Sequence, residues 1–380
     1  MTLRLRALGA SVAVHFEAGI TPEMADELRR AWARCMDASE EPSRPGTVDG
    51  THDGGSRFSA RVLASGRESR VAGETFAQFA SELTSTVTLS AIEARGGELL
   101  MLHASGLADP LTGRTAALVG RSGIGKTTAT KALATDLGYV SDETVGIEGS
   151  GLLVPYAKPL SVIVDAPPAP KRQIGPDELG LRAAPAEARL AAVVLLDRVA
   201  SAGSPRVEPL GHAEAIIELA PHTSSLARVR RPLQRLCSAL DACGGAVRVT
   251  YREASDLAAL IPGFLSRPAV AAAWVPAVVD ASSPVDAGLP PGLLRRAAVV
   301  DAVELSGLGE TCNELLAMVG QRVVRLGGVA PAIWRALATP ADLRVLAERI
   351  APEIGLPDGY EDVLARATTE LESQGILVRT

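Results

Sequence analysis

An eight-residue glycine-rich segment, GRSGIGKT at residues 120–127, restricts the fold of this chain more than any other feature. It matches the phosphate-loop pattern at every position. In such a loop, glycines allow consecutive backbone N–H groups to turn towards phosphate oxygens, and the helix that follows directs its positive end at the anion. An apolar run precedes the segment, and a stretch of helical character follows it. The sequence therefore predicts an α/β fold that binds a nucleoside triphosphate.

The side chains of this loop have distinct expected roles. Lys126 should neutralise the outer phosphates, and the Thr127 hydroxyl should hold Mg²⁺. A chance match is improbable, because the chain has only four lysines among its 38 basic residues. We therefore expect ATP and Mg²⁺ as cofactors. The residues expected to bind the nucleotide are Gly120, Arg121, Ser122, Gly123, Ile124, Gly125, Lys126, Thr127 and Thr128.

Lys158 is another of the four lysines, and it precedes Pro159. One interpretation is that its ammonium group reaches a phosphate of the nucleotide. The alternative is a surface lysine before a proline turn. The sequence alone leaves both interpretations open.

Composition excludes several classes of partner. The formal charge is −6, whereas proteins that bind nucleic acid need clustered lysine and arginine. The N-terminus lacks the apolar stretch of a signal peptide, and the most apolar run is shorter than the roughly 20 residues that a membrane span needs. The four cysteines form neither a CxxC pair nor a zinc-ligand pattern. We therefore expect a cytoplasmic globular protein with no nucleic-acid or membrane partner.

The elements predicted before residue 268 are those of a mixed α/β domain. Two apolar runs, 98–103 and 115–119, flank the turn sequence DPLTG and are predicted to form a hairpin that leads into the glycine-rich loop. A helix at 127–137 and a short strand at 138–140 are predicted after the loop. Further predicted elements are strands at 3–16, 190–196 and 246–251, helices at 21–36, 75–94 and 213–219, and a loop at 40–55.

A change of composition divides the chain. Residues 268–291 are rich in alanine, valine, proline, serine and glycine and carry almost no charge, which is typical of a linker. We therefore predict domains at 1–267 and 292–380. Strands followed by helices and a final strand suggest that the second is a small winged-helix-like α+β unit. Its elements are expected at 297–305, 313–319, 322–326, 330–337, 340–350, 360–373 and 376–379.

Three runs of residues resemble the C-terminal catalytic domain of HPr kinase/phosphorylase: HASG from residue 103, ALVGRSGIGKTT from residue 117 and GYVSDETV from residue 138. The resemblance implies a fold like that of phosphoenolpyruvate carboxykinase. It also implies that Asp142 deprotonates a substrate serine and that His103 lies close to Asp142. Glu143 stands where the family has a second aspartate and is, with Thr127, an expected metal ligand. Independently, a carboxylate at the end of a strand beside the γ-phosphate can accept a hydroxyl proton.

These catalytic assignments have structural alternatives. Asp142 or Glu143 could cap a turn or a helix, and His103 could be a satisfied core histidine on an apolar strand. The chain also lacks the glycine-rich signature segment that the bifunctional family carries for phosphorolysis. We therefore expect a kinase or a nucleotide-binding protein rather than a phosphorylase.

The segment from about residue 293 to residue 380 resembles the PqqD-like recognition domains of ribosomal peptide-modifying pathways, through RVVRLGGVAPAIWRAL from residue 322 and LESQGIL from residue 371. The resemblance implies capture of the leader of a precursor peptide. An exposed strand edge can achieve this by accepting the peptide as an added strand. The expected edge consists of Arg322, Val323, Val324, Arg325 and Leu326.

The C-terminal segment has two alternative roles. A DNA-binding winged helix is disfavoured, because the segment has nine arginines against twelve acidic residues. A dimerisation or lid domain is the second alternative, since small winged folds often serve only as contacts.

The expected function is an ATP-dependent kinase that phosphorylates a hydroxyl, foremost that of serine, on a precursor peptide held by the C-terminal domain. Two alternatives are a nucleotide-binding peptide-delivery chaperone that transfers no phosphate, and a regulator that phosphorylates a carrier protein as HPr kinase does. The resemblance also raises a homo-oligomer as an expectation, because HPr kinases form hexamers.

Overall fold

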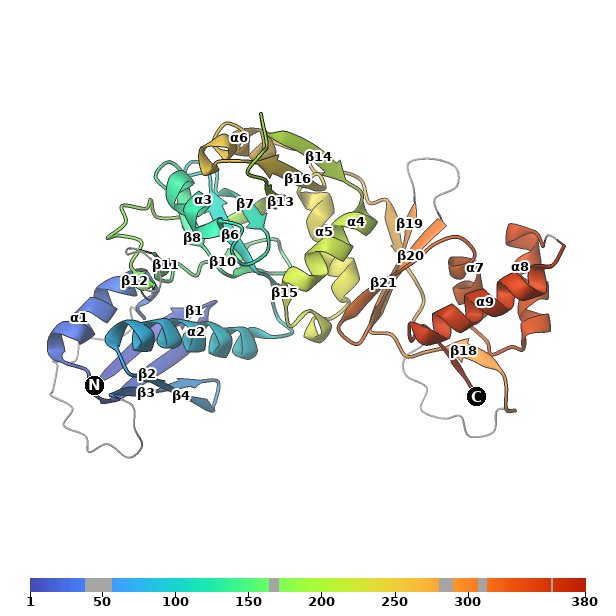
Figure 1. Ribbon diagram of the computed structural model, residues 1–380, viewed down its shortest axis with the longest axis horizontal. Helices are drawn as coiled ribbons and strands as arrows, with labels where there is room; N and C mark the ends of the chain where they lie inside the picture. Colours follow the sequence, from blue (N-terminus) through green and yellow to red (C-terminus); the bar gives the residue numbers. More distant parts are fainter. Residues whose placement is uncertain (38–56, 164–170, 280–289, 307–312, 357) are drawn as a thin grey trace. The chain divides into compact units, whose positions relative to one another are not determined.

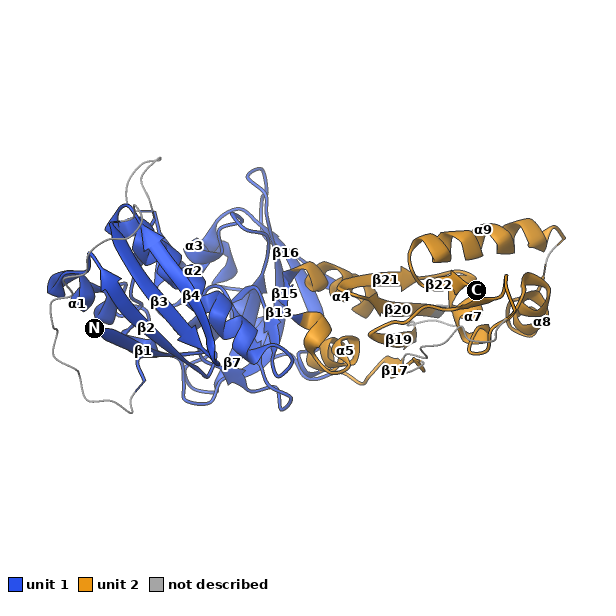
Figure 2. Cartoon of the chain, turned by 90° about the horizontal axis from the view of Figure 1, so that it is seen from below, with its two compact units in different colours: residues 1–210, 222–225, 242–269 blue, residues 211–221, 226–241, 270–380 orange. Residues whose placement is uncertain are grey.

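A computed structural model describes residues 1–37, 57–163, 171–279, 290–306, 313–356 and 358–380 (Figure 1). The chain divides into two compact units (Figure 2). Unit 1 comprises residues 1–210, 222–225 and 242–269, and unit 2 comprises residues 211–221, 226–241 and 270–380. The loop predicted at 40–55 lies outside the described residues.

The N-terminal part of unit 1 is an antiparallel four-stranded sheet in the order β1-β2-β3-β4, with α2 packed on it. Apolar and polar residues alternate along β1, β2 and β3, so one face of the sheet carries the core. Threonines cap both helices of this layer: Thr21 accepts the N–H of Met24, and Thr75 forms a capping box with Gln78. The bounds are β1 Thr2–Ala7, β2 Ala10–Ala18, α1 Pro22–Ala31, β3 Phe58–Ala64, β4 Arg67–Gly73 and α2 Phe76–Arg95, with a 3₁₀ turn at Ala33–Cys35.

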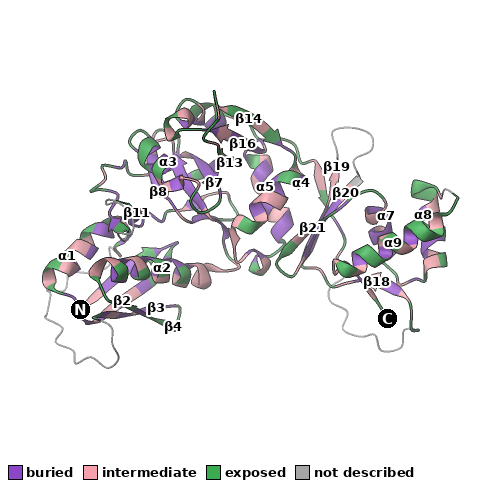
Figure 3. Ribbon diagram, viewed as in Figure 1, coloured by how far each residue is buried: buried purple, intermediate pink, exposed green. Residues whose placement is uncertain are grey.

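The central sheet of unit 1 has six strands in the order β14-β16-β13-β7-β6-β8. Strand β13 runs parallel to β7 and to β16, and its middle is buried on both faces, which explains its continuous apolar sequence (Figure 3). The bounds are β6 Ala104–Ala108, β7 Arg114–Val119, α3 Lys126–Leu133, β8 Gly138–Ser141, β13 Arg189–Arg198, β14 Arg206–Leu210, β16 Ala246–Tyr251 and α6 Ile261–Leu265, with a 3₁₀ turn at Ala254–Leu257.

The hairpin before the glycine-rich loop differs from the prediction. Strand β7 pairs with β6, whereas β5, Leu100–Leu102, belongs to a separate sheet in the order β10-β9-β5-β15. His103 is the single residue between β5 and β6, so it lies where the chain passes from one sheet to the other. The remaining small strands are β9 Val145–Ile147, β10 Leu153–Val154, β15 Thr223–Ser224 and the pair β11 Leu160–Val162 with β12 Arg172–Ile174.

Unit 2 contains a four-stranded antiparallel sheet in the order β17-β19-β20-β21 and a second pair, β18 with β22. Trp334 and Ile333 are fully buried in the hydrophobic core of this unit. The helices are α4 His212–Leu219, α5 Pro232–Ala242, α7 Ala330–Ala336, α8 Leu343–Ile354 and α9 Tyr360–Ser373, and short 3₁₀ turns lie at Ala220–His222 and Leu226–Arg228. The strands are β17 Trp274–Pro276, β18 Leu294–Arg296, β19 Asp301–Ser306, β20 Asn313–Val319, β21 Arg322–Leu326 and β22 Leu377–Arg379.

The mixed sheets confirm the predicted α/β class, while two features of the chain's organisation were not anticipated. The predicted linker at 268–291 contains β17, which pairs with β19. Helix α4 and nearly all of α5 belong to the compact unit that holds the C-terminal residues. Among the described residues, none of the helices combines the length and the apolar character needed to cross a bilayer.

A candidate nucleotide-binding site

The glycine-rich loop connects β7 to α3, as its sequence predicts. Gly123 and Gly125 have φ values of +84° and +98°, a region that residues with a Cβ adopt only with strain. A Cβ on Gly120 would lie 3.0 Å from Cγ2 of Ile124. The loop therefore favours glycine for its conformation at two positions, and at a third a Cβ would crowd the Ile124 side chain.

Lys126 begins α3, and its ammonium group lies inside the curve of the loop. Nζ donates to the carbonyl oxygens of Gly120 at 2.6 Å and Arg121 at 3.3 Å. Burial lowers the pKa of Lys126, while the charges of Asp142 and Glu143 oppose that shift. The loop and the two acids thus hold a cation at the point where the phosphate-loop pattern requires one.

Asp142 follows β8 and turns one carboxylate oxygen towards the glycine-rich loop. The Thr127 hydroxyl lies 3.4 Å from Oδ2 of Asp142, and the Tyr139 hydroxyl donates to Oδ1 at 3.2 Å. Tyr139 is buried, and burial followed by the charge of Asp142 raises its pKa well above the usual value. The phenol therefore stays protonated and orients Asp142 with Oδ2 towards Thr127.

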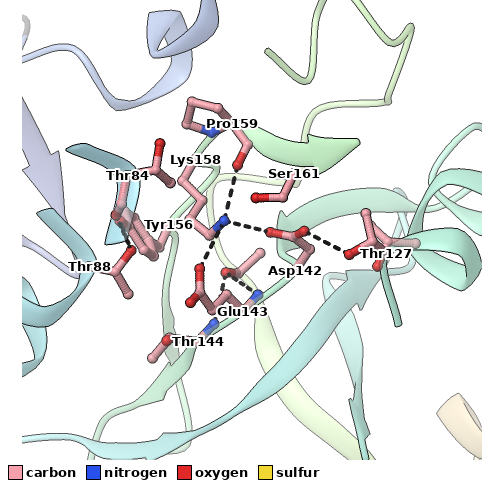
Figure 4. A network of polar contacts seen from close by, with 12 residues as sticks. Thr84, Thr88, Thr127, Asp142, Glu143, Thr144, Tyr156, Lys158, Pro159 and Ser161 are labelled. Atoms are coloured by element: carbon pink, nitrogen blue, oxygen red, sulfur yellow. Dashed lines mark hydrogen bonds and ion pairs between the residues drawn. The ribbon is translucent and has the colours of Figure 1, made fainter. Parts of the chain in front are cut away.

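The ammonium group of Lys158 lies between the carboxylates of the two acids (Figure 4). Its Nζ is 3.2 Å from Oδ1 of Asp142 and 3.0 Å from Oε2 of Glu143, and it donates to the Pro159 carbonyl oxygen at 3.0 Å. Three acceptors match the three hydrogens of an ammonium group. With 2% of its surface exposed, Lys158 is no surface residue, so that interpretation of the sequence was wrong.

Burial and charge act in opposite directions on Lys158. Burial alone lowers its pKa, but the charges of Asp142 and Glu143 and the hydrogen bonds to them outweigh burial, so the pKa of Lys158 is raised. The side chain is therefore a permanent cation at neutral pH. A buried charge of this kind requires paired, hydrogen-bonded partners, and both are present.

The chain segment that carries Lys158 is fixed by Tyr156. The Tyr156 ring is fully buried, its hydroxyl lies 2.8 Å from Oγ1 of Thr88 on α2, and its backbone N–H donates to the Val140 carbonyl at 3.1 Å. The segment is thereby tied both to α2 and to the strand that precedes Asp142. Lys158 is thus positioned by contacts distant in sequence.

His103 occupies the strand junction and lines the same cavity as Asp142 and Glu143. Its backbone N–H donates to the His222 carbonyl at 2.6 Å, which fixes the position of the main chain. This bond does not involve the imidazole ring. Burial, followed by the charge of Lys126, lowers the pKa of His103. A neutral imidazole beside the acids can accept a proton from a substrate bound in the cavity. A histidine buried in the core, away from any cavity, could not reach such a substrate.

These residues surround one cavity of about 460 Å³. Of the predicted nucleotide-binding residues, Gly120, Arg121 and Ile124 do not line this cavity. The carbonyl oxygens of Gly120 and Arg121 nevertheless accept hydrogen bonds from the Lys126 ammonium group. The predicted residues that line the cavity are His103, Ser122, Gly123, Gly125, Lys126, Thr127, Thr128, Asp142 and Glu143. All four lysines of the chain are in its wall, including Lys131 and Lys171.

Arg198 also lines the cavity and was missed by the sequence analysis. It ends β13, which runs parallel to β7, so its position and the start of the glycine-rich loop meet at one edge of the sheet. Its guanidinium donates to the Arg252 carbonyl at 2.8 Å and to Glu253 at 3.3 Å. The signal that could have found it is its place directly after an apolar strand, but the neighbouring strand cannot be identified from spacing.

The donor set suits Mg²⁺ at one position. The Thr127 hydroxyl and Oδ2 of Asp142 are adjacent oxygen ligands, and Mg²⁺ is commonly held by one or two protein oxygens with phosphates and waters completing its shell. Glu143, the predicted second ligand, is paired with Lys158 instead, and its role at the metal stays a prediction. Within the described residues, no cluster of three or more histidines, cysteines and acids forms an all-protein metal site.

The predicted peptide-binding residues form β21, the edge strand of the unit 2 sheet. Leu326 is buried, Val323 and Val324 are half-buried, and the two arginines are exposed. Arg325 pairs with Glu314 of β20 at 2.5 Å. A cavity of about 370 Å³ in the same unit, lined by Arg230, Arg231, Gln234, Arg235, Ser238 and Trp274, includes none of the β21 residues.

Comparisons with known proteins return little. No protein-family model matches the chain, and no curated protein does. A solved structure of the Hpr(Ser) kinase/phosphatase from Coxiella burnetii aligns with 13% sequence identity over 43% of this chain and 93% of that chain, with a TM-score of 0.22. A TM-score this low does not establish a shared fold.

Proposed function

We propose that this chain is a Mg²⁺- and ATP-dependent kinase that phosphorylates a hydroxyl, foremost that of serine, on a ribosomally made precursor peptide. The observation that carries the proposal is the meeting of the glycine-rich loop and Asp142 in one cavity, with Thr127 Oγ1 3.4 Å from Asp142 Oδ2. Phosphoryl transfer requires a phosphate cradle, a metal position and a carboxylate at one place, and all three coincide here.

The loop and the cations of the cavity bind the triphosphate. Backbone N–H groups of the loop and the N-terminus of α3 face the phosphates, and Lys126 neutralises the outer ones. Thr127 and Asp142 would hold Mg²⁺, which screens the charge of the phosphoryl group during transfer. Arg198, Lys131 and Lys171 add positive charge around the cavity.

The acids and His103 act on the acceptor. As the acceptor oxygen bonds to the γ-phosphorus, the bond from that phosphorus to the β,γ-bridging oxygen breaks and ADP departs. The hydroxyl proton passes to Asp142, or to the neutral ring of His103 on the same wall. Tyr139 and Lys158 hold Asp142 so that Oδ2 is the oxygen presented to the reacting groups.

The C-terminal residues are proposed to bind the peptide leader. Strand β21 is an edge strand, and an edge offers backbone donors and acceptors to an added strand. Binding the leader would raise the effective concentration of the acceptor near the cavity. The acceptor segment itself would then need little affinity for the kinase site.

One observation favours the non-catalytic alternative, a peptide-delivery chaperone that binds nucleotide. Oδ1 of Asp142 already receives bonds from Lys158 and Tyr139, which stabilise the carboxylate without any substrate. Asp142 can therefore serve a structural role without taking part in transfer. Whether the wild-type protein transfers phosphate at all therefore distinguishes a kinase from a chaperone, and Asp142→Asn tests whether Asp142 takes part in transfer.

The test uses Lys126→Ala and Asp142→Asn, with Asp136→Asn as a matched control on the exposed turn after α3. The purified protein is incubated with Mg-ATP and the peptide encoded beside its gene, and phosphate-sized mass gains are measured together with nucleotide affinity. A kinase loses transfer in both variants and keeps it in the control. If wild type transfers no phosphate while binding nucleotide, the kinase assignment is wrong. If Asp142→Asn transfers phosphate at the wild-type rate, the role given to Asp142 is wrong.

The remaining alternative is a regulator that phosphorylates a carrier protein. It predicts that Val323→Pro, in the edge strand β21, leaves activity on its substrate unchanged. The leading proposal instead predicts that this variant modifies leader-bearing peptide more slowly, while leaderless peptide at high concentration is modified as before. Comparing both peptides with the variant and the wild-type chain separates the two proposals.

A further inference from the structure

The gap between Asp142 and Glu143 is filled by an ammonium group. Nζ of Lys158 bridges Oδ1 of Asp142 and Oε2 of Glu143 at 3.2 and 3.0 Å, and its third bond goes to the Pro159 carbonyl (Figure 4). Both Lys158 and the Asp142 carboxylate are buried. This is a fixed interior charge rather than a surface ion pair.

Enzymes that transfer phosphoryl groups often hold two divalent cations between their carboxylates and the phosphates. The second cation neutralises the acids and draws them to the reacting phosphate. Lys158 performs the first of these tasks without a metal, because its three donors are already directed at the two acids and a carbonyl. Oδ1 of Asp142 and Oε2 of Glu143 are thereby occupied, and Oδ2 remains directed at Thr127.

The formal charges of the cavity wall also favour a single divalent cation. Four lysines, Arg198 and two acids give the cavity wall a net charge of +3, in a chain whose total is −6. A triphosphate carries about −4 at neutral pH, so one Mg²⁺ with it leaves the filled site near +1. A second Mg²⁺ would return the site to about +3 with no further anion to balance it.

The choice of lysine supports a role that depends on shape. The chain has 34 arginines and four lysines, and every lysine lies at this cavity. An ammonium group is a compact charge with freely directed donors, whereas guanidinium is a wide planar fork. Three acceptors converging on one nitrogen can be satisfied by lysine alone among the basic side chains.

We propose that Lys158 takes the place of a second divalent cation, so that the site works with a single Mg²⁺ at Thr127 and Asp142 Oδ2. This inference rests on the proposed function. Lys158 is a positioning residue in this scheme, because it acts on the acids and not on the substrate.

The experiment counts bound metal ions rather than turnover. Mn²⁺ is titrated into full-length protein saturated with a non-hydrolysable ATP analogue, and free Mn²⁺ is followed by electron paramagnetic resonance. The variants are Lys158→Met, which removes the charge, and Lys158→Gln, which removes the charge but keeps an amide donor for Asp142. The matched control is Lys131→Met, which removes a lysine from the exposed rim of the same cavity.

We expect wild type and Lys131→Met to bind about one Mn²⁺ per chain, and each folded Lys158 variant to bind about two, because two unpaired carboxylates then attract a second ion. Adding Glu143→Gln to Lys158→Met should return the count to about one. Two ions in wild type overturn the inference, even if neither Lys158 variant folds. One ion in a folded Lys158 variant also overturns it.

The nucleotide measurement separates this inference from the proposed function. If wild type does not bind the ATP analogue, the proposed function fails. If it binds the analogue together with two ions, the proposed function stands and only the assignment of Lys158 fails.

Discussion

The Thr127 hydroxyl at the start of α3 lies 3.4 Å from Oδ2 of Asp142 at the end of β8. Two successive elements that follow the phosphate loop, α3 and β8, thus contribute adjacent oxygens to one cavity. Since Tyr139 and Lys158 occupy the other carboxylate oxygen, this pair of oxygens is the proposed position of Mg²⁺.

Removing the Thr127 hydroxyl should weaken metal binding more than nucleotide binding. Thr127→Val keeps the shape of the side chain but lacks the oxygen, so we expect the Mg²⁺ concentration for half-maximal transfer to rise about 10- to 100-fold. Thr127→Ser keeps the oxygen and should change this Mg²⁺ concentration little. A magnesium titration of the phosphorylation rate measures both variants, and equal behaviour of the two would contradict the assignment.

His103 predicts how activity depends on pH. Burial and the charge of Lys126 lower its pKa from 6.5, so the ring stays neutral somewhat below pH 6.5 in the folded protein. If the ring accepts the acceptor's proton, transfer should hold its rate to below pH 6.5 and fall only under the lowered pKa. His103→Asn should remove that acid limb of the rate profile. An unchanged limb in the variant would show that another group titrates there.

The same shift affects stability, with a definite sign. Between the lowered folded pKa and 6.5, the unfolded chain binds more protons than the folded one. Stability should therefore fall as the pH drops below about 6.5, and His103→Asn should reduce that slope. Denaturant unfolding of both proteins at pH 7.5 and pH 5.5 provides the measurement.

Gly123 tests the conformation of the loop without steric crowding. An added Cβ would meet nothing within 4 Å, but the φ of +84° strains any residue with a Cβ. Gly123→Ala should thus cost about 1–2 kcal/mol in the binding conformation, a loss of about 5- to 30-fold in nucleotide affinity. Gly203→Ala is the control, because Gly203 also has open space but no positive φ. Calorimetry with Mg-ATP compares the two, and equal affinities would show that the loop does not need this φ to bind.

The edge of β21 should matter for leader-bearing peptide alone. Val323→Pro removes a backbone donor that faces away from β20, so the KM for leader-bearing peptide should rise about tenfold while leaderless peptide is unaffected. Val323→Ala keeps the donor in the same strand and is the control. Circular dichroism checks that both variants fold. An effect of Val323→Ala equal to that of Val323→Pro would argue against leader binding at β21.

The buried cysteines should react slowly with reagents that attack thiolates. Burial raises the pKa of Cys35, Cys237 and Cys243 to about 12, so almost no thiolate exists at pH 8. In a Cys312→Ser background, the folded protein should show no rapidly reacting thiol with a disulfide reagent, and the denatured protein should show all three. Rapid reaction of any one in the folded state would show that its surroundings open.

The sequence by itself determined the elements whose cause is local. The loop at 120–127 is recognisable because each glycine, lysine and threonine meets a requirement within a few residues of chain. The caps at Thr21 and Thr75 and the buried strand β13 follow from neighbouring residues in the same way. His103 and Asp142 were selected through a resemblance, and the structure places both on the cavity wall.

Only the tertiary structure decided which distant segments meet. The spacing of the chain could not show that β5 leaves the central sheet, that Arg198 ends beside the phosphate loop, or that α4 belongs to unit 2. Lys158 is the clearest case, since its burial depends on Tyr156 packing against α2, nearly seventy residues earlier. The hydrogen bond between Tyr156 and Thr88 and the ion pairs of Lys158 with Asp142 and Glu143 join residues that are distant in sequence. The residues next to Lys158 and Pro159 therefore do not encode them.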